Sequence, residues 1–559
     1  MLRPSRRQFF ATSSSLIAGA ALGTSRAATA SVCTLPTRSR KPIDTFLPDI
    51  VDPDTLRALA SAAIEAAKDA GATYADIRVA DVRRLRVDWS MPELMPLPRN
   101  DMWLEYHYGL RVRVGSAWSF EFGSDPSLDE VRRAARAATI TARGLARVTP
   151  DAAAMLPAPA VRSEWATPLT IDPFRVSPDE YAMLLGAFID AAQRVRYGTV
   201  QELTLNWVTE TRVFASSEGS LLTQRLTRGN PTVVVHAGTP LRHGGVALPV
   251  ADIIPGGIGF EYVLRPGIQD RIKETTEEAA KLIHYPEGDA EVGRFPAVFD
   301  GATTGAVIAT TIARALEGSR VLGENMDDAG GSFLSPIEST LGQPIFSPRL
   351  TIEADTPFPH HNAPRWDDEG MPMESFTVVD QGRPVDYFMT RSTVPMLAGW
   401  YAKMKRPLRT HGTCIAWGAS DVPDACASQL TVHTGSSGTT LGTLVKELGT
   451  GLLIYGVGGE ETPAGVMTNP QVSGGIFSPR MLFEVKNGQI VRRLRGGIVQ
   501  FSVKTLAKQI VSLGDSSSVQ CHVYQNWQGF NGAPRTTPVL APAAHLTSLD
   551  VMQMKGALG

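Results

Sequence analysis

The stretch from Phe299 to Ser332 constrains the fold of this chain more than any other part of the sequence. A short apolar run ends at Phe299, and Asp300 and Gly301 mark a turn. The spacing of one buried helix face then follows, at Val307, Ile308, Thr311, Ile312, Ala315 and Leu316. Gly318 is the expected end of this helix. We therefore predict a buried central helix around which the rest of the chain is arranged.

Length and composition are those of a large globular protein. The 559 residues predict two or more domains with ample apolar cores. An apolar share of 43% and a charged share of 20% are typical of a soluble chain. The formal net charge of −2 gives no argument for binding nucleic acid, so we expect no nucleic acid partner.

Residues 1–30 have the order of an export signal. Ser5–Phe10 is a twin-arginine pattern, Ala11–Gly23 is mildly apolar, and Ala28–Ala30 is a small-x-small cleavage site. The alternative is a chance Arg-Arg pair in a disordered tail. The apolar run is too short to span a bilayer. The sequence therefore predicts twin-arginine export, a periplasmic or secreted protein, and no transmembrane segment in the mature chain.

Helical and alternating patterns follow one another through residues 31–290. The expected helices lie at 54–70, 127–143 and 270–283, with another opened by the capping signature Ser177–Glu180. The expected strands lie at 74–89, 108–114, 118–122 and across 200–235. A boundary near residues 285–295 then gives an N-terminal α/β domain over 31–290.

Residues 291–559 are rich in strand patterns and punctuated by glycines. The expected strands lie at 350–354, 376–382, 387–389, 451–455, 474–484 and 489–495, and a helix is expected at about 440–448. Residues 367–370 form an acidic turn, Asp-Asp-Glu-Gly. The two parts together predict an α+β fold, in which a β-rich, barrel- or sandwich-like C-terminal domain follows the α/β domain.

Several segments resemble one known family, TldD/PmbA. They read YGLRVRVGSAWSFEF from Tyr108, FTVVDQGRPVDYFMTR from Phe376, SGGIFSPRMLFEVKNGQIVRRLRGG from Ser473 and SLGDSSSVQC from Ser512. The resemblance runs from Asp54 to the C-terminus. It implies a metallopeptidase-like protein that handles peptides in an enclosed groove between paired subunits. It also implies a homo- or heterodimer with a family homologue.

Active members of that family carry a His-Glu-x-x-x-His zinc motif just before Leu-Glu-Gly. Here Leu-Glu-Gly stands with Glu317 at its centre, and the motif positions hold Ala309, Thr310 and Arg314. Ala309 has no ligand atom, Thr310 is no carboxylate base, and the permanent charge of Arg314 repels a divalent ion. We therefore assign no catalytic residue. The structural alternative is a core helix whose Arg314 faces solvent or a cavity.

Cys521 falls where the active subfamily has a third zinc ligand near its C-terminus. One thiolate alone does not hold zinc, and the neighbouring His522 points to the opposite face if the segment is a strand. The alternative for Cys521 is an inherited buried thiol.

The densest group of ligand-type side chains surrounds His360 and His361. It also includes Asp355, Asp367, Asp368 and Glu369. The alternative is an exposed turn, because the histidines follow two prolines, Pro357 and Pro359, and prolines favour turns.

Three functions remain open at this stage. The leading hypothesis is a zinc-motif-deficient homologue, exported, that adds shape and peptide contacts to a peptide-processing complex and needs no assigned cofactor. The second is an active peptidase with zinc at a relocated site that uses Cys521 and the loop of His360 and His361. The third is a periplasmic peptide- or ligand-binding protein that works alone.

Overall fold

Helices and strands are mixed along the chain in the computed structural model, which confirms the predicted α+β class. The described residues are 51–90, 99–150, 154–238, 245–250, 253, 256, 259–324, 331–354, 364–416, 418–427, 429–458, 467–469, 474–526 and 535–553. The signal peptide predicted over residues 1–30 lies outside them, so export stays a prediction.

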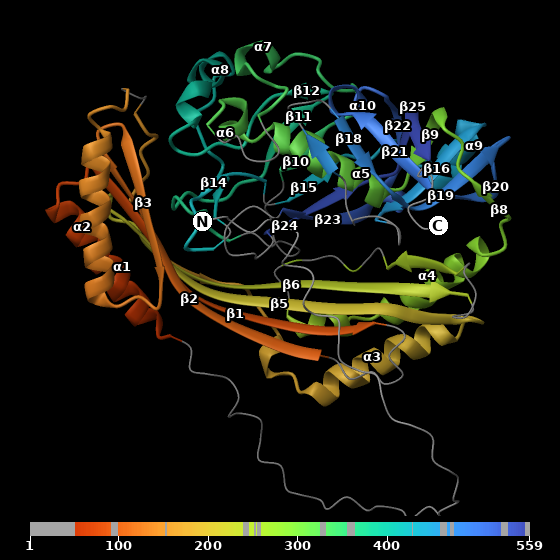
Figure 1. Cartoon of the computed structure of the whole chain (residues 1–559), viewed down its shortest axis with the longest axis horizontal. Coiled ribbons are helices and arrows are strands. Elements are labelled where there is room, and N and C mark those ends of the chain that lie inside the picture. Colours follow the sequence, from red (N-terminus) through yellow and green to blue (C-terminus); the bar gives the residue numbers. More distant parts are fainter. Residues whose placement is uncertain are drawn as a thin grey trace, which may run out of the picture. The chain divides into compact units, whose positions relative to one another are not determined.

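Alternating side chains in the first half build a seven-stranded sheet with the order β3-β2-β1-β5-β6-β4, and β7 pairs with β6 (Figure 1). On the central strand, Ile77 lies opposite Leu110 of β2 and Ala215 of β5, both antiparallel. The bounds are β1 Tyr74–Ser90, β2 Arg99–Val114, β3 Ala117–Ser124, β4 Arg162–Ala166, β5 Gly198–Ser216, β6 Leu221–Ala237 and β7 Val246–Pro249.

Helices α1, α2 and α3 cover one face of this sheet, and α4 packs beside α3 in the same core. Ile77 and Val79 pack in a core with α1 and α2, while Leu85 and Val87 belong to a core that includes α3. Because odd-numbered residues of β1 share one face, all three helices lie on that face. The helix bounds are α1 Pro53–Asp69, α2 Leu128–Leu145, α3 Pro178–Gln193 and α4 Ile268–Leu282. The capping box predicted at Ser177 is present.

The second half contains a ten-stranded and a six-stranded sheet, drawn from green to blue in Figure 1. The ten-stranded sheet has the order β17-β18-β21-β25-β9-β16-β19-β20-β8, with β22 beside β25. Its bounds are β8 Glu287–Asp289, β9 Gly293–Phe299, β16 Gly451–Val457, β17 Met467–Asn469, β18 Gly474–Phe477, β19 Pro479–Lys486, β20 Gln489–Arg495, β21 Gly497–Ser502, β22 Ile510–Leu513 and β25 Ala544–Gln553.

The six-stranded sheet has the order β12-β11-β10-β15-β24-β23, and β13 and β14 form a separate pair. Its bounds are β10 Ile352–Ala354, β11 Phe376–Asp380, β12 Arg383–Pro384, β15 Leu430–Val432, β23 Gln520–Asn526 and β24 Arg535–Ala541; the pair is β13 Cys414–Ile415 and β14 Asp424–Ala425. Short helices connect the strands: α6 Gly318–Val321, α7 Ile337–Thr340, α8 Ala398–Lys403, α9 Leu441–Leu448 and α10 Val503–Leu506.

The predicted central helix begins as α5, Gly301–Ile308, and touches β16 of one sheet and both β23 and β24 of the other. Glycine permits the close approach: a Cβ on Gly301 would lie 2.4 Å from Ala541 O, and one on Gly305 would lie 3.0 Å from Val539 O. Gly318 was expected to end the helix, and this is wrong. It begins α6, and its N–H donates to Phe388 O at 2.8 Å.

The two halves share a hydrophobic core. Phe188 and Trp207 of the first half belong to the same buried cluster as Val298, Leu453 and Phe483 of the second. Asp49–Gly559 accordingly forms one compact unit, and a domain boundary near residue 290 stays a prediction. No helix in the described ranges is long and apolar enough to cross a membrane.

Candidate functional site

Asp300 fixes the start of the central helix. Its carboxylate accepts hydrogen bonds from Thr303 N at 2.9 Å and from Gly456 N of β16 at 3.0 Å. Burial raises the pKa of Asp300, and these hydrogen bonds oppose the rise. Because this N-cap also binds a neighbouring strand, it sets the position of α5 along the ten-stranded sheet.

The helix changes from α to π over Ala309–Ala313. Thr310 Oγ1 donates to Ala306 O at 3.0 Å, and Thr311 Oγ1 donates to Val307 O at 2.5 Å, so both hydroxyls bind the preceding turn. In an α-helix, residues five apart point about 140° away from each other. A π-turn closes its hydrogen bonds between such residues and brings them one above the other. Positions 309 and 314 are therefore brought toward the same side.

The side chains at these positions do not fit a zinc ion. Ala309 is 1% exposed and ends in a methyl group, and the Thr310 hydroxyl is engaged with the backbone. Arg314 is 8% exposed, so it does not face bulk solvent, and it carries a positive charge. The backbone turn is present, but it presents neither a ligand nor a carboxylate base.

Glu317 follows the π-turn and is buried together with two cations. Arg320 donates to its carboxylate from a fully buried guanidinium, and Arg314 also acts on it electrostatically. Burial raises the pKa of Glu317, and Arg320 and Arg314 oppose this rise. The Leu-Glu-Gly segment thus ends in a buried cluster of mixed charge.

Cys521 and His522 lie on β23, beside the central helix. Leu540 and Val539 of β24 are their register partners, and a Cβ on Gly305 would lie 3.1 Å from the Cβ of His522. Burial raises the pKa of Cys521 to about 12 and lowers the pKa of His522 to about 4. A cysteine binds zinc as the thiolate, and the burial of Cys521 opposes the loss of its proton. Cys521 as a ligand stays a prediction that the burial does not favour.

The acidic turn at residues 367–370 is buried. Asp368 accepts from Arg212 Nη1 at 2.5 Å and from Ala416 N at 2.6 Å, and Glu369 accepts from Arg391 N at 2.6 Å. Burial and the neighbouring Glu369 raise the pKa of Asp367 well above its usual range. These carboxylates are engaged within the protein, which leaves them poorly placed to bind a metal.

His360 and His361 lie outside the described residues, as does Asp355, so their role as ligands stays a prediction. Among the residues that the structure describes, no group of three His, Cys, Asp or Glu side chains is arranged to hold a metal.

Sequence reasoning missed a buried charged face on the seven-stranded sheet. Asp76 accepts from Arg111 Nη2 at 2.6 Å, and Arg111 Nη1 lies 3.2 Å from Glu369. Arg212 binds both Glu210, at 2.6 Å, and Asp368. The signal was the alternation of charged residues on these strands, which is usual for a solvent face. The acidic turn of the second half covers that face instead.

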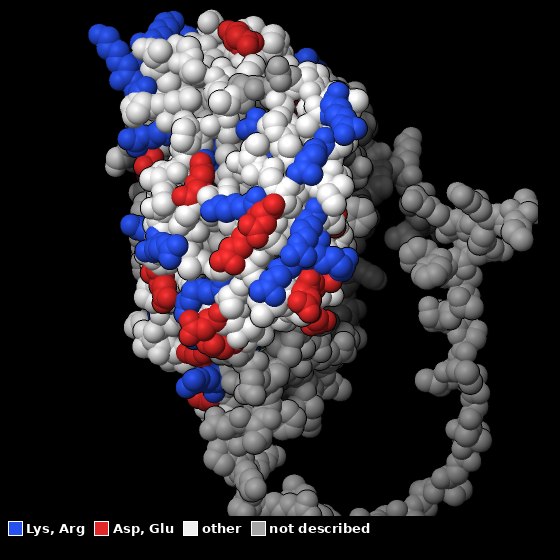
Figure 2. Space-filling model, turned by 90° about the vertical axis from the view of Figure 1, so that its left-hand side faces the viewer, with Lys and Arg blue, Asp and Glu red and all other residues white. Residues whose placement is uncertain are grey.

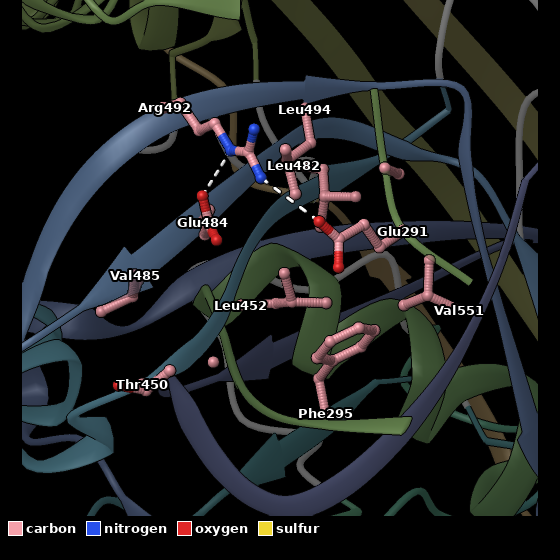
Figure 3. Close-up of a pocket in the computed structure, with 12 residues that line it drawn as sticks. Glu291, Phe295, Thr450, Leu452, Leu482, Glu484, Val485, Arg492, Leu494 and Val551 are labelled. Atoms are coloured by element: carbon pink, nitrogen blue, oxygen red, sulfur yellow. Dashed lines mark hydrogen bonds and ion pairs between the residues drawn. The ribbon is translucent and has the colours of Figure 1, made fainter. Parts of the chain in front are cut away.

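One pocket opens on the ten-stranded sheet (Figure 3). It has a volume of about 70 Å³, and its lining includes Phe295, Leu452, Leu482, Leu494 and Val551. Charged residues stand at its rim: Arg492 pairs with Glu484 and lies 3.5 Å from Glu291. An apolar group about the size of one side chain would fit there.

The surface at the left of Figure 1, which carries α2, mixes the two signs of charge (Figure 2). On α2, Arg133 pairs with Glu130, and Arg132 lies 3.8 Å from Asp129. Such i,i+3 pairs are ordinary on an exposed helix. The expectation of no nucleic acid partner is not tested by this face and stays a prediction.

Comparison with known protein families identifies the family of the C-terminal part of the chain. Residues 292–552 match the PmbA/TldA metallopeptidase C-terminal domain. No curated protein sequence matches the chain.

Three crystal structures share the fold. A protein from Thermotoga maritima described as a candidate modulator of DNA gyrase has a TM-score of 0.62 at 14% identity, over 88% of this chain and 99% of its own. TldE from Thermococcus kodakarensis also has a TM-score of 0.62 at 14% identity, over 88% of this chain and 99% of its own. A candidate modulator of DNA gyrase from Bacteroides thetaiotaomicron has a TM-score of 0.60 at 15% identity, over 89% and 98%.

At such identities the structures establish the fold alone, and the matched domain carries the assignment. None of the ten histidines in the sequence is followed by Glu, so no His-Glu-x-x-x-His motif occurs anywhere in the chain. The strands and the central helix of the matched domain are nevertheless in place. Residues 292–552 therefore form a C-terminal domain of the TldD/PmbA metallopeptidase family.

Proposed function

We propose that this protein is a zinc-motif-deficient family member that contributes shape and peptide contacts to a peptide-processing assembly. The observation that carries the proposal is the π-turn at Ala309–Ala313. A motif with its two histidines five residues apart needs a turn that brings such positions together. The turn persists here, while Ala309, Thr310 and Arg314 supply no ligand and no base.

The buried charges after the turn support a structural role for this region. Arg314 and Arg320 both act on Glu317, so a fixed cation stands where a metal-binding relative would carry a ligand. A permanent guanidinium lowers the affinity of its surroundings for a divalent ion. The protein would therefore hold its central helix without metal.

Partner and location follow from the family and the N-terminus. The active role would belong to a paired homologue that carries the intact zinc motif, and the peptide would bind between the subunits. The twin-arginine pattern in residues 1–30 would deliver the folded protein to the periplasm or beyond.

Metal analysis of the purified full chain tests the central claim. We expect substoichiometric zinc and no peptide hydrolysis, and no change in either for Cys521→Ala. Cys426→Ala, which removes a thiol with no proposed ligand role, is the matched control. Stoichiometric zinc that is lost in Cys521→Ala alone would instead support the relocated metal site.

Co-expression tests the proposed assembly. The chain, produced with a homologue that carries the zinc motif, should co-purify with it, and peptide hydrolysis should require both proteins. A chain that stays monomeric, binds peptide alone and leaves the homologue's activity unchanged would favour the stand-alone binding protein.

A further inference from the structure

Strand β3 is the last strand at one end of the seven-stranded sheet, and its outer edge has no partner strand among the residues that the structure describes (Figure 1). Just beyond its end, Asp125 N donates to Tyr106 O of β2 at 2.8 Å. Because bonded and non-bonded pairs alternate along an antiparallel ladder, the odd-numbered residues of β3 bond to β2. The N–H and C=O groups that point outward therefore belong to the even-numbered residues, Trp118, Phe120, Phe122 and Ser124.

Nothing on β3 itself opposes the addition of another strand to this edge. The strand has eight residues and contains no proline or lysine. Its one charged side chain, Glu121, lies opposite Leu110 on the face that α2 covers. Sheet edges are normally protected by such residues or by short strands. The strand at the other end of the sheet, β4, follows this rule: it has five residues, and Arg162 and Glu164 are exposed on it.

The side chains beside the open edge are aromatic. Trp118, Phe120 and Phe122 alternate along β3 and share the charged face of the sheet, where Arg78 Cζ lies 5.9 Å from the centroid of the Phe120 ring. The rings of Phe120 and Phe122 stack with their centroids 6.0 Å apart, and Phe122 is 62% exposed. Aromatic side chains next to unpaired backbone groups are typical of a surface that binds another chain.

The sequence of β3 is complementary to itself in one antiparallel register. If a two-fold axis passes through Phe120, this residue faces its own copy, and Trp118 and Phe122 face each other. Glu121 then lies opposite Ser119, whose hydroxyl can donate to the carboxylate. Each ring thus meets a ring of the other copy, and cross-strand aromatic pairs stabilise a sheet.

The neighbouring registers are less favourable. An axis at Glu121 would place the two carboxylates directly opposite each other, which is destabilising, and Trp118 would face Ser124. An axis at Ser119 would leave Phe122 without an aromatic partner. The order of residues on β3 therefore selects the register centred on Phe120.

The helix behind the edge leaves room for a second copy. Because α2 packs on both β2 and β3, its axis lies over the gap between these two strands. Paired strands are about 4.8 Å apart, so the α2 axes of two copies would be about 10 Å from each other. Packed helices have axes about 8–10 Å apart, so the two helices would meet without overlap.

We propose that the outer edge of β3 binds the same edge of a second copy of this chain, antiparallel and with Phe120 on the two-fold axis. The two seven-stranded sheets would then form one continuous sheet. The pair at Phe120 and the two pairs of Trp118 with Phe122 would each exchange two backbone hydrogen bonds. This inference concerns the association of the chain with itself and does not rest on the proposed function.

Sedimentation velocity on the purified full chain tests the interface. We expect a dimer whose dissociation constant rises at least about tenfold in Phe122→Lys, because a lysine on an edge strand opposes strand addition. Val148→Lys makes the same change at a residue that is 80% exposed outside β3, and it should leave the dimer unchanged. A monomer at concentrations up to about 100 μM, or a dimer that Phe122→Lys leaves intact, would overturn the proposal. A monomer that binds an extended peptide only while Phe122 is present would assign the edge to peptides instead.

Oxidative cross-linking tests the register without removing an aromatic ring. In the double variant Ser119→Cys, Glu121→Cys, each new thiol lies opposite the other one across the axis, at a Cα spacing of about 4.5 Å that a disulfide can bridge. A covalent dimer should form in the double variant and not in either single variant or the wild type. A covalent dimer of one single variant would overturn the register centred on Phe120, and none in the double variant would overturn the interface.

Discussion

Over residues 76–79, the two faces of strand β1 are equally buried and chemically opposite. Ile77 and Val79 are 0% exposed and pack under α1 and α2, whereas Asp76 and Arg78 are also 0% exposed and belong to the charged face. The helices that cover the apolar face are near in sequence. The residue that pairs with the charged face, Glu369, lies almost three hundred positions away.

This difference separates two ways of stabilising a sheet. The apolar face gains from burial whichever apolar group covers it, because the hydrophobic effect is non-directional. The charged face is stable only if each donor and acceptor meets its partner, because an unpaired buried charge is strongly destabilising. Substitutions on the two faces should therefore destabilise the protein for different reasons: loss of apolar burial on one face, and an unpaired buried charge on the other.

Removal of one cation from the charged face should have the largest effect. Arg212→Met leaves Asp368 and Glu210 without their shared partner, and we expect a loss of about 3 to 5 kcal/mol in the free energy of unfolding. Urea unfolding measures it. Arg294→Met, which removes an exposed pair with Asp550, is the control and should remain close to wild type.

Truncation on the apolar face should cost somewhat less. Ile77→Ala removes a buried side chain next to α1, and we expect a loss of about 2 to 4 kcal/mol in the same measurement. Ile140→Ala, at a position that is 66% exposed on α2, should change little. A larger loss from Ile77→Ala than from Arg212→Met would reverse the proposed order of the two faces.

Gly109→Ala tests the contact between the charged face and the loop Gly418–Asp421. A new Cβ would meet Ala419 O at 2.0 Å, so the loop must shift, and we expect a loss of about 1 to 3 kcal/mol. Amide exchange of Ala419 should become faster. Gly144→Ala, on α2 with nothing within 4 Å of the added Cβ, should be neutral or slightly stabilising.

The smallest effect should come from pH. Burial lowers the pKa of His107, whose Nε2 accepts from Ala419 N and must be unprotonated to do so. The unfolded state binds this proton first, so the stabilisation is complete above pH 6.5 and is lost as the pH falls below 6.5 toward the lowered pKa.

His107→Gln isolates that contribution, because an amide oxygen can still accept from Ala419 N at every pH. Urea unfolding at pH 7.5 and pH 5.5 should show a smaller loss for the variant than for the wild type. Equal losses would assign the pH dependence to other groups, of which His522 is one, since burial lowers its pKa to about 4.

Elements with local signals could be predicted from the sequence. The capping box at Ser177, the hairpin of β2 and β3 and the apolar stripe of the central helix each depend on neighbouring residues. The prediction that this helix ends at Gly318 was wrong. Glycine at this position permits a close approach to Phe388, which the sequence does not reveal.

Some features of the candidate site could likewise be predicted from the sequence, and others could not. The degenerate positions Ala309, Thr310 and Arg314 follow from their distance to Leu-Glu-Gly in the sequence. The π-turn between them could not be predicted, because a shift in backbone hydrogen bonding depends on what packs against the helix. The burial of Asp368 likewise requires a partner strand, and no local pattern identifies Arg212 as that partner.

The core that joins Trp207 to Phe483 bears on any attempt to divide this protein. A cut at residue 290 would leave two fragments, each with half of that core open to water. Exposed apolar surface of this kind promotes aggregation. Fragments made separately should therefore be poorly soluble, whereas fragments produced together should find each other and reconstitute the whole.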